Sequence, residues 1–153
     1  MHTGYALVWM AAERTPEHPA LVDDRTDRRL TYAELIAEVD AVAAGFAANG
    51  IGRGARVAIA LPSVWEHCIA LLALMRLNAV PAVLNFRLKP DEIVGLCRAS
   101  SVDAAVILPD AALAQVIEAA LPDGAPIWAV GAEIGPARSF SGCRADSVKL
   151  VAY

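Results

Sequence analysis

Short unbroken apolar segments alternate with longer helical stretches over most of this chain, and few folds accommodate that alternation. The segments Arg56–Leu61, Ala104–Leu108 and Pro126–Val130 carry almost no polar residues. A strand without alternating polar residues is typically buried on both faces of a parallel sheet. Helices between such strands favour right-handed βαβ units. The sequence therefore predicts an α/β fold, with a mostly parallel sheet and alternating helices, in a single domain spanning residues 1–153.

Helix boundaries can be read from start and stop signals. Thr31 and Glu34 form one predicted capping box, and Ser63 and Glu66 a second. Gly50 suits the left-handed position after a helix, and Pro90 suits the first turn of one. The expected helices are Tyr5–Arg14, Thr31–Asn49, Val64–Asn78, Pro90–Ser100 and Asp110–Leu121.

The remaining segments complete the expected domain. A small β-hairpin is predicted at about residues 20–31, around a charged turn at Asp24–Arg28. Val80–Leu84 reads as a further strand, and Pro81 near its start indicates a strand end or an edge strand. Gly131–Arg144 reads as a loop. Val148–Tyr153 begins to read as another strand, so we expect a fold that is incomplete at the C-terminus.

Composition excludes several classes of function. The net charge is −4 and the basic residues are scattered, so no nucleic-acid partner is expected. The longest apolar run, Cys68–Met75, falls far short of the about 18 residues of a membrane span. Residues 1–10 lack the features of a signal peptide. Three widely spaced cysteines indicate reduced thiols, and we expect a cytoplasmic protein.

The chain offers few candidates for catalysis. Gly50–Gly54 follows a helix and precedes a strand, whereas a phosphate loop does the reverse, so we interpret it as a plain connection. His67 lies one turn after Ser63, but Ser63 is better explained as a helix cap than as a nucleophile. Cys68 reads as a small buried apolar residue.

Acidic residues and metal ligands give no stronger signal. The acids Asp23, Asp24 and Asp27 alternate with arginines and indicate a solvated hairpin tip. Asp91 and Glu92 suit the first turn of a helix. No histidine or cysteine pair has metal-ligand spacing. We therefore predict no catalytic residue and no metal site in this chain.

The segment Asn85–Lys89 is different, because it lies between the end of a strand and the start of a helix. Ligands of open α/β sheets gather at such strand ends. Arg87 and Lys89 place two cations there, which would suit a phosphate. A surface loop without a ligand is the alternative.

Four stretches resemble motifs of the AMP-forming acyl-CoA synthetases, the adenylate-forming enzyme family. In order, they are similar to "LTYAEL", "GxxxGDRVA", "PNSxE" and "GAVxxPLNPRLxxxE" at Leu30–Leu35, Gly52–Ala58, Pro62–Glu66 and Asn78–Glu92. The likeness covers roughly Tyr5–Leu108, and its wording is most similar to the benzoate and 4-chlorobenzoate CoA ligases. Asn78 stands where the family usually has glycine, and Phe86 where it usually has proline.

The resemblance implies an ATP-dependent carboxylate–CoA ligase. In that family a carboxylic acid attacks ATP in the presence of Mg²⁺, giving an acyl- or aryl-adenylate, and coenzyme A then displaces AMP. The resemblance also implies that Arg87 contacts the nucleotide phosphate of coenzyme A, with Lys89 as a weaker neighbour.

The family's phosphate loop, adenine segment and C-terminal lysine domain have no counterpart here. The residues up to Tyr153 are similar to the strand that precedes the phosphate loop. We therefore expect an N-terminal segment of a ligase that is inactive alone and binds none of these cofactors well. Such a segment should leave helix Val64–Asn78 exposed, so we also expect self-association through exposed apolar surface.

Two alternatives remain open. One is an adenylation module that loads a carrier protein instead of coenzyme A. The other is a stand-alone, non-catalytic α/β binding module, which should cover helix Val64–Asn78 by itself.

Overall fold

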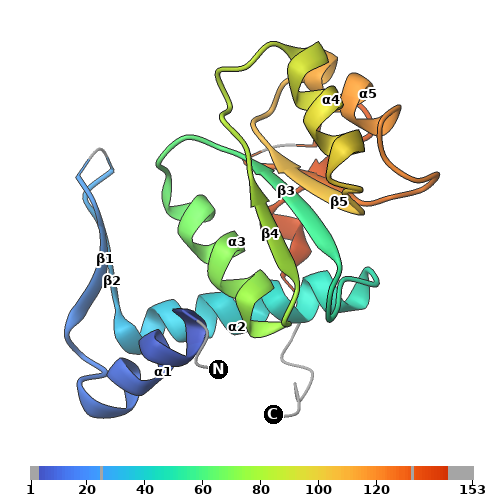
Figure 1. Ribbon diagram of the computed structural model, residues 1–153. Helices are drawn as coiled ribbons and strands as arrows, with labels where there is room; N and C mark the ends of the chain where they lie inside the picture. The colour runs from blue at the N-terminus through green and yellow to red at the C-terminus, as the bar shows by residue number, and fades with distance from the viewer. Residues whose placement is uncertain (1–3, 25, 132, 145–153) are drawn as a thin grey trace.

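Within the residues that the structure describes, a five-stranded parallel sheet with helices on both faces forms the body of the protein (Figure 1). The computed structural model describes residues 4–24, 26–131 and 133–144, and the predicted strand Val148–Tyr153 lies outside them. In chain order the elements are α1 (Gly4–Arg14), β1 (Pro19–Asp23), β2 (Arg28–Thr31), α2 (Tyr32–Ala48), β3 (Arg56–Ala60), α3 (Trp65–Arg76), β4 (Val80–Val83), α4 (Pro90–Ala99), β5 (Ala104–Ile107), α5 (Ala111–Glu118), β6 (Ile127–Ala129), β7 (Arg138–Ser139) and the 3-10 helix η1 (Ser141–Cys143).

The strand order in the sheet is β4-β3-β5-β6-β7, and every neighbouring pair is parallel. This confirms the predicted fold class and the edge position of Pro81 on β4. Strands β1 and β2 form a separate antiparallel hairpin, which is also confirmed. The expectation of a loop over Gly131–Arg144 is wrong in part, because this segment contains β7 and η1. β7 consists of one arginine and one serine, so it carries no apolar signal.

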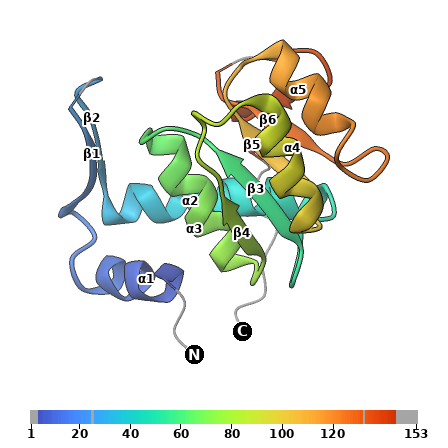
Figure 2. The same ribbon diagram turned by 45° about the horizontal axis from the view of Figure 1, so that its top comes forward.

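The sheet is buried between two apolar layers, which explains its unbroken apolar strands. Val57 and Ile59 of β3 pack on one side with α2 and α3, whereas Ala58 and Ala60 pack on the other side with α4 and α5. Figure 2 shows α4 and α5 together on one face, and α2 and α3 on the other. Successive strand residues point to opposite faces, so each strand must be apolar at every position.

Three features at the ends of α2 and α3 agree with the sequence. Thr31 caps α2: its Oγ1 accepts from Glu34 N at 3.2 Å, and Glu34 Oε2 accepts from Thr31 N at 2.8 Å. These bonds lower the pKa of Glu34. Gly50, after α2, has φ +83, and Asn78, after α3, has φ +54. Asparagine tolerates the left-handed region, so it replaces a glycine there at little cost.

Helix α3 differs from its prediction at the start. The N-cap residue is Val64, with no side-chain cap hydrogen bond of its own, so the predicted N-cap position at Ser63 is wrong by one residue. Val64 itself takes the extended backbone of a cap, with φ −117 and ψ 159, which places Ser63 before the cap position.

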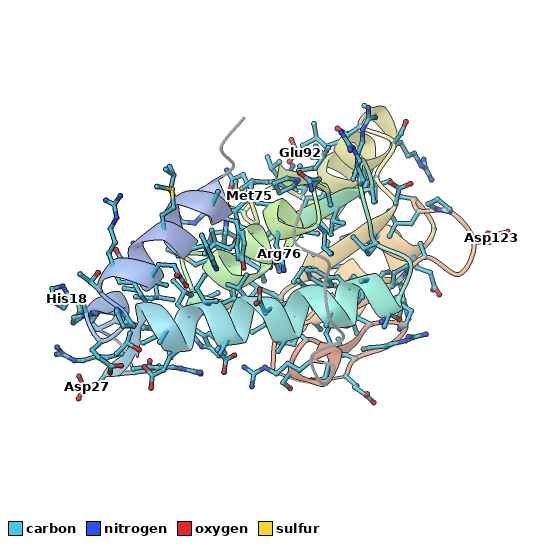
Figure 3. The ribbon with its side chains drawn as sticks, turned by 90° about the horizontal axis from the view of Figure 1, so that it is seen from below. His18, Asp27, Met75, Arg76, Glu92 and Asp123 are labelled. Carbon is cyan, nitrogen blue, oxygen red and sulfur yellow. The ribbon has the colours of Figure 1, made fainter. Side chains whose placement is uncertain are left out.

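Helix α3 is covered within this chain, by the sheet and by α1 and α2, so the expectation that a fragment would leave it exposed is wrong. Ile69, Ala70, Ala73 and Leu74 are buried, and no α3 residue is fully exposed. Arg76 of α3 points toward α2, where its Nε lies 3.3 Å from Asp40 Oδ1 (Figure 3). Tyr5 of α1 donates to the same carboxylate at 2.9 Å. Burial and this hydrogen bond raise the pKa of Tyr5 to about 12.

One face of α2 holds the segment 138–144. Arg138 donates to the Asn49 side chain at 3.0 Å, and Arg144 donates to Glu38. Between these contacts, a Cβ placed on Gly45 would lie 1.3 Å from the carbonyl oxygen of Cys143. Only a residue without a side chain permits this approach of η1 to the helix.

Candidate functional site

The predicted ligand loop lies where the sequence places it, after the carboxyl end of β4 and before α4. Asn85 shapes it: its Oδ1 accepts from Arg87 N at 3.0 Å, and its carbonyl oxygen accepts from Leu88 N at 3.1 Å. These bonds close a tight turn with Phe86 and Arg87 at its tip. Phenylalanine fits this turn, so the departure from proline at position 86 leaves the turn intact.

Both predicted cations are exposed at this loop. The Arg87 guanidinium carbon lies 5.6 Å from the centre of the Phe86 ring, a cation–π distance. Lys89 is the N-cap residue of α4, and its backbone N–H donates to Glu92 Oε2 at 2.8 Å. The ten-residue helix α4 begins beside these two cations, but its first turn also carries the acids Asp91 and Glu92, which offset their charge. Arg87, at the tip of the turn, is the cation best placed to meet an anion approaching from solvent.

The sheet places this loop at an edge where ligands commonly bind. The strand order reverses between β3 and β5, and ligands of open parallel sheets lie outside the carboxyl ends of strands near such a reversal. The β4–α4 loop lies beside the carboxyl end of β3, since β4 pairs with β3 in parallel. The topology thus places the Arg87 loop at the carboxyl edge of the sheet, one strand away from this reversal.

His67, also at this edge, has its Nδ1 within 3.3 Å of the carbonyl oxygens of Leu61 and Pro62. A carbonyl oxygen only accepts, so Nδ1 carries the proton and braces the turn after β3. The arrangement assigns His67 Nδ1 to the turn rather than to a nucleophile, in keeping with the sequence interpretation.

The remaining sequence candidates are structural. Gly50 and Gly54 both have positive φ and connect α2 to β3, as predicted. At the hairpin tip the Asp27 side chain is 90% exposed and lies 3.6 Å from Arg29, which confirms a solvated tip. In the described ranges, no three histidine, cysteine or acidic side chains come close enough to hold a metal ion. No helix in the same ranges has the length and hydrophobicity of a membrane span.

Cys68, Cys97 and Cys143 are free thiols. Burial raises the pKa of each, and that of Cys143 to about 12, so they are poor nucleophiles. Cys68 is half-buried rather than fully buried as predicted, because it lies on the side of α3 away from the sheet-facing residues.

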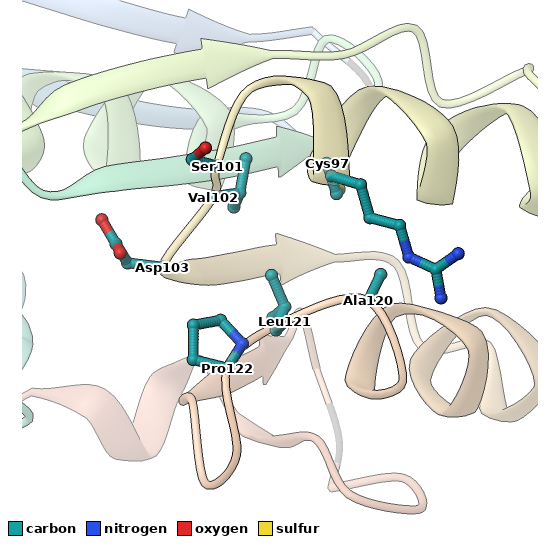
Figure 4. A pocket seen from close by; sticks show the side chains of 8 residues that line it. Cys97, Ser101, Val102, Asp103, Ala120, Leu121 and Pro122 are labelled. Carbon is teal, nitrogen blue, oxygen red and sulfur yellow. The ribbon is translucent and has the colours of Figure 1, made fainter.

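The sequence did not indicate a cavity of about 300 Å³ between the C-terminal ends of α4 and α5 (Figure 4). Cys97, Val102 and Leu121 form its apolar part. On its rim Arg98 donates to the Ala119 carbonyl at 3.3 Å, and Asp103 accepts from Arg56 N at 2.8 Å. The cavity lies at the amino end of β5, so it is separate from the Arg87 loop. No sequence motif indicates this pocket, because it forms between the ends of two helices that are separate in the sequence.

The sequence also missed a cluster around Trp65. The Arg28 guanidinium lies 3.6 Å from the centre of the Trp65 ring, and that of Arg144 lies 5.9 Å from it. Glu38 pairs with both arginines. The cluster joins the hairpin, α2, α3 and the segment after η1, which are far apart in sequence and so leave no local pattern.

Comparisons with known proteins identify the family and the fold of this chain. The family model described as AMP-binding enzyme matches residues 8–139. The chain is 42% identical to a 4-chlorobenzoate–CoA ligase of Arthrobacter over 102 residues, which are 67% of this chain and 20% of that protein. It is 34% identical over 125 residues to the fatty acid–[acyl-carrier-protein] ligase MmaC of Mycobacterium marinum, covering 81% of this chain and 23% of that protein.

A solved structure, the N-terminal domain of FACL13 from Mycobacterium tuberculosis, has a TM-score of 0.81 and 28% identity. The match covers 99% of this chain and 39% of that one. The chain therefore spans about a fifth of the length of the curated relatives it matches.

Proposed function

Since the chain belongs to the family of AMP-binding enzymes, we propose that it forms the N-terminal part of an ATP-dependent carboxylate–CoA ligase. A carboxylic acid first attacks the α-phosphate of ATP and releases pyrophosphate. The thiol of coenzyme A then attacks the resulting acyl-adenylate and releases AMP. The first step activates the carboxylate for attack by the thiol, because AMP is a far better leaving group than oxide. The site must stabilise the phosphate charge that develops.

The residues of this chain fit one part of that reaction, the binding of a phosphate of coenzyme A. The observation that carries this proposal is Arg87, exposed on a turn at the carboxyl edge of the sheet and followed by Lys89 at the start of α4. An arginine can hold a phosphate through paired hydrogen bonds, and Lys89 adds a second positive charge. Mg²⁺ would stabilise phosphate charge in the complete enzyme. In the described part of the chain, no three histidine, cysteine or acidic side chains lie close enough together to hold it.

A chimeric enzyme tests the proposal. The matching segment of the Arthrobacter 4-chlorobenzoate–CoA ligase is replaced by this chain, and thioester formation is measured. We expect Arg87→Ala to raise the KM for coenzyme A at least about tenfold, the loss of one charge-assisted phosphate contact. Adenylate formation, followed by pyrophosphate exchange, should be unchanged because coenzyme A takes no part in it.

Arg53→Ala is the matched control, since Arg53 is an exposed arginine on the α2–β3 connection, at the opposite end of the sheet. An unchanged KM for coenzyme A in Arg87→Ala would refute the role of Arg87. A KM raised equally in Arg53→Ala would point to overall charge instead.

The acid and the thiol acceptor are further proposals. We propose a small carboxylic acid, of the aromatic class by likeness to the 4-chlorobenzoate–CoA ligase. Likeness to an acyl-carrier-protein ligase supports a carrier protein as the alternative acceptor. Thioester formation by the chimera with coenzyme A, compared with a carrier protein bearing phosphopantetheine, separates the two. The free thiols support a reducing compartment, the cytoplasm.

One observation favours a second candidate, a non-catalytic binding module. Helix α3 is covered by α1, α2 and the sheet of this same chain, as a self-sufficient domain requires. A soluble monomer with a cooperative unfolding transition would support independent folding. Independent folding alone would not decide between the two functions, so the chimera remains the test of the ligase proposal.

A further inference from the structure

The outer edge of β4 has no strand partner in the part of the chain that the structure describes. β4 is the first strand of the sheet and pairs with β3 on one side (Figure 1). Val80 and Val83 are 47% and 54% exposed, one on each face of this edge. The segment Ala79–Leu84 contains no charged residue. Apolar, uncharged edge strands of this kind are templates for pairing with another chain.

The hydrogen bonds of β4 show which backbone groups face outward. Val80 N–H donates to the Ala55 carbonyl at 2.7 Å, and Leu84 N–H donates to the Ile59 carbonyl at 2.9 Å. Backbone groups alternate in direction along a strand, so positions 80, 82 and 84 face β3. Positions 81 and 83 therefore face away from the sheet.

Proline occupies one of these two outward positions. Pro81 has no N–H, so an approaching strand meets one backbone donor, that of Val83, where two are expected. The proline ring also fills the space that a partner carbonyl would enter. Charge, a common protection of edge strands, is missing from β4, so the proline and the shortness of this four-residue strand are its protective features.

A second copy of this chain is the partner that fits the edge. Two copies of β4 can lie antiparallel with residue 81 of each opposite residue 83 of the other, and such opposed residues exchange both N–H···O bonds. The two apolar, uncharged edges then match, whereas a charged partner strand would find no complement. Pro81 removes half of these hydrogen bonds. We infer that Pro81 prevents β4 of one copy from pairing with β4 of another, and so keeps the sheet from extending across two molecules.

The test compares the wild-type chain with Pro81→Val by light scattering coupled to size exclusion, over a wide range of concentration. Valine restores the N–H and has high β-propensity. We expect the wild type to keep a constant mass, and the mass of Pro81→Val to rise toward twice that of the wild type as concentration increases. Adding Val83→Lys to Pro81→Val places a charge on the edge and should restore the wild-type mass. Pro122→Val, in the exposed connection after α5, is the control for removing a proline elsewhere.

Circular dichroism verifies that each variant is folded, and Pro81→Ala replaces Pro81→Val if valine disturbs the sheet. A folded Pro81→Val and a folded Pro81→Ala that both keep the wild-type mass would overturn the inference. So would a wild-type chain that already associates and becomes monomeric with Val83→Lys, because the proline would then not block the edge. Association of Pro122→Val to the same extent would also contradict it.

Discussion

Replacing Gly45 with alanine should destabilise the protein, although alanine is the better helix former. Gly45 lies inside α2, where exchange for alanine normally stabilises a helix by about 1 kcal/mol. Here an added Cβ would lie 1.3 Å from the Cys143 carbonyl oxygen and 2.5 Å from its carbonyl carbon. Both atoms belong to the backbone, so no side chain can rotate away to relieve the clash.

The size of the effect follows from the movement required. Ordinary contact with a Cβ begins near 3.4 Å, so η1 must move away from α2 by about 2 Å. That movement separates Phe140 from Phe46, whose ring centres lie 6.2 Å apart, and breaks the contact between Arg138 and Asn49. Overpacking of a buried site costs about 1–3 kcal/mol, and rigid backbone on both sides places this case at the upper end. We expect Gly45→Ala to lower the free energy of unfolding by about 2 kcal/mol after the helix gain is included.

Urea denaturation measures this change. Trp128 is 1% exposed and lies 4.8 Å from Phe46, so its fluorescence reports on the affected core. Gly95→Ala is the matched control, because Gly95 lies inside α4 with no atom within 4 Å of an added Cβ. That control should gain about 0.5–1 kcal/mol. A Gly45→Ala variant as stable as the wild type, or stabilised like Gly95→Ala, would refute the claim that η1 packs against bare helix backbone.

Three further substitutions test other parts of the fold. Asn78→Gly should leave stability unchanged or raise it, whereas Asn78→Val should cost about 1–2 kcal/mol because φ is +54; equal urea midpoints would contradict this. The pKa of Tyr5 is raised to about 12 by burial and by its bond to Asp40, so its contribution to stability is present below pH about 10 and is lost as pH rises toward 12. The free energy of unfolding should therefore fall more steeply across that range in the wild type than in Tyr5→Phe, and parallel pH profiles would oppose this. Thr31→Ala should lose about 1 kcal/mol through the capping box, while Thr26→Ala at the exposed hairpin tip should change little; similar losses in thermal unfolding would argue against a specific cap.

Much of the fold follows from local signals. Thr31 with Glu34, Gly50 and Pro90 each sets a helix end through a backbone requirement that a few neighbouring residues satisfy. The parallel sheet follows from apolar strands that need two covered faces. The Arg87 loop was also predictable in position, because it joins a strand end to a helix start.

Other features depend on contacts between distant segments. β7 is a strand because Phe140 N–H and its neighbours meet β6, although Arg138 and Ser139 have no strand-like composition. The N-cap of α3 is Val64 rather than the predicted Ser63, because the turn after β3 delays the start of the helix by one residue. Nothing in the local sequence indicates that position 45 must be glycine. The atom that excludes a side chain there is the carbonyl oxygen of Cys143, which is far away in the chain.

The central claim is that these residues supply the first part of an AMP-forming carboxylate–CoA ligase. It is tested most directly by pyrophosphate release in the presence of ATP, Mg²⁺ and 4-chlorobenzoate. The 153 residues span a fifth of the relative's length, so by themselves they should release none. The chimera with the Arthrobacter ligase should release pyrophosphate and form the thioester. Pyrophosphate release by the chain alone, or a folded chimera that forms neither adenylate nor thioester, would contradict the claim.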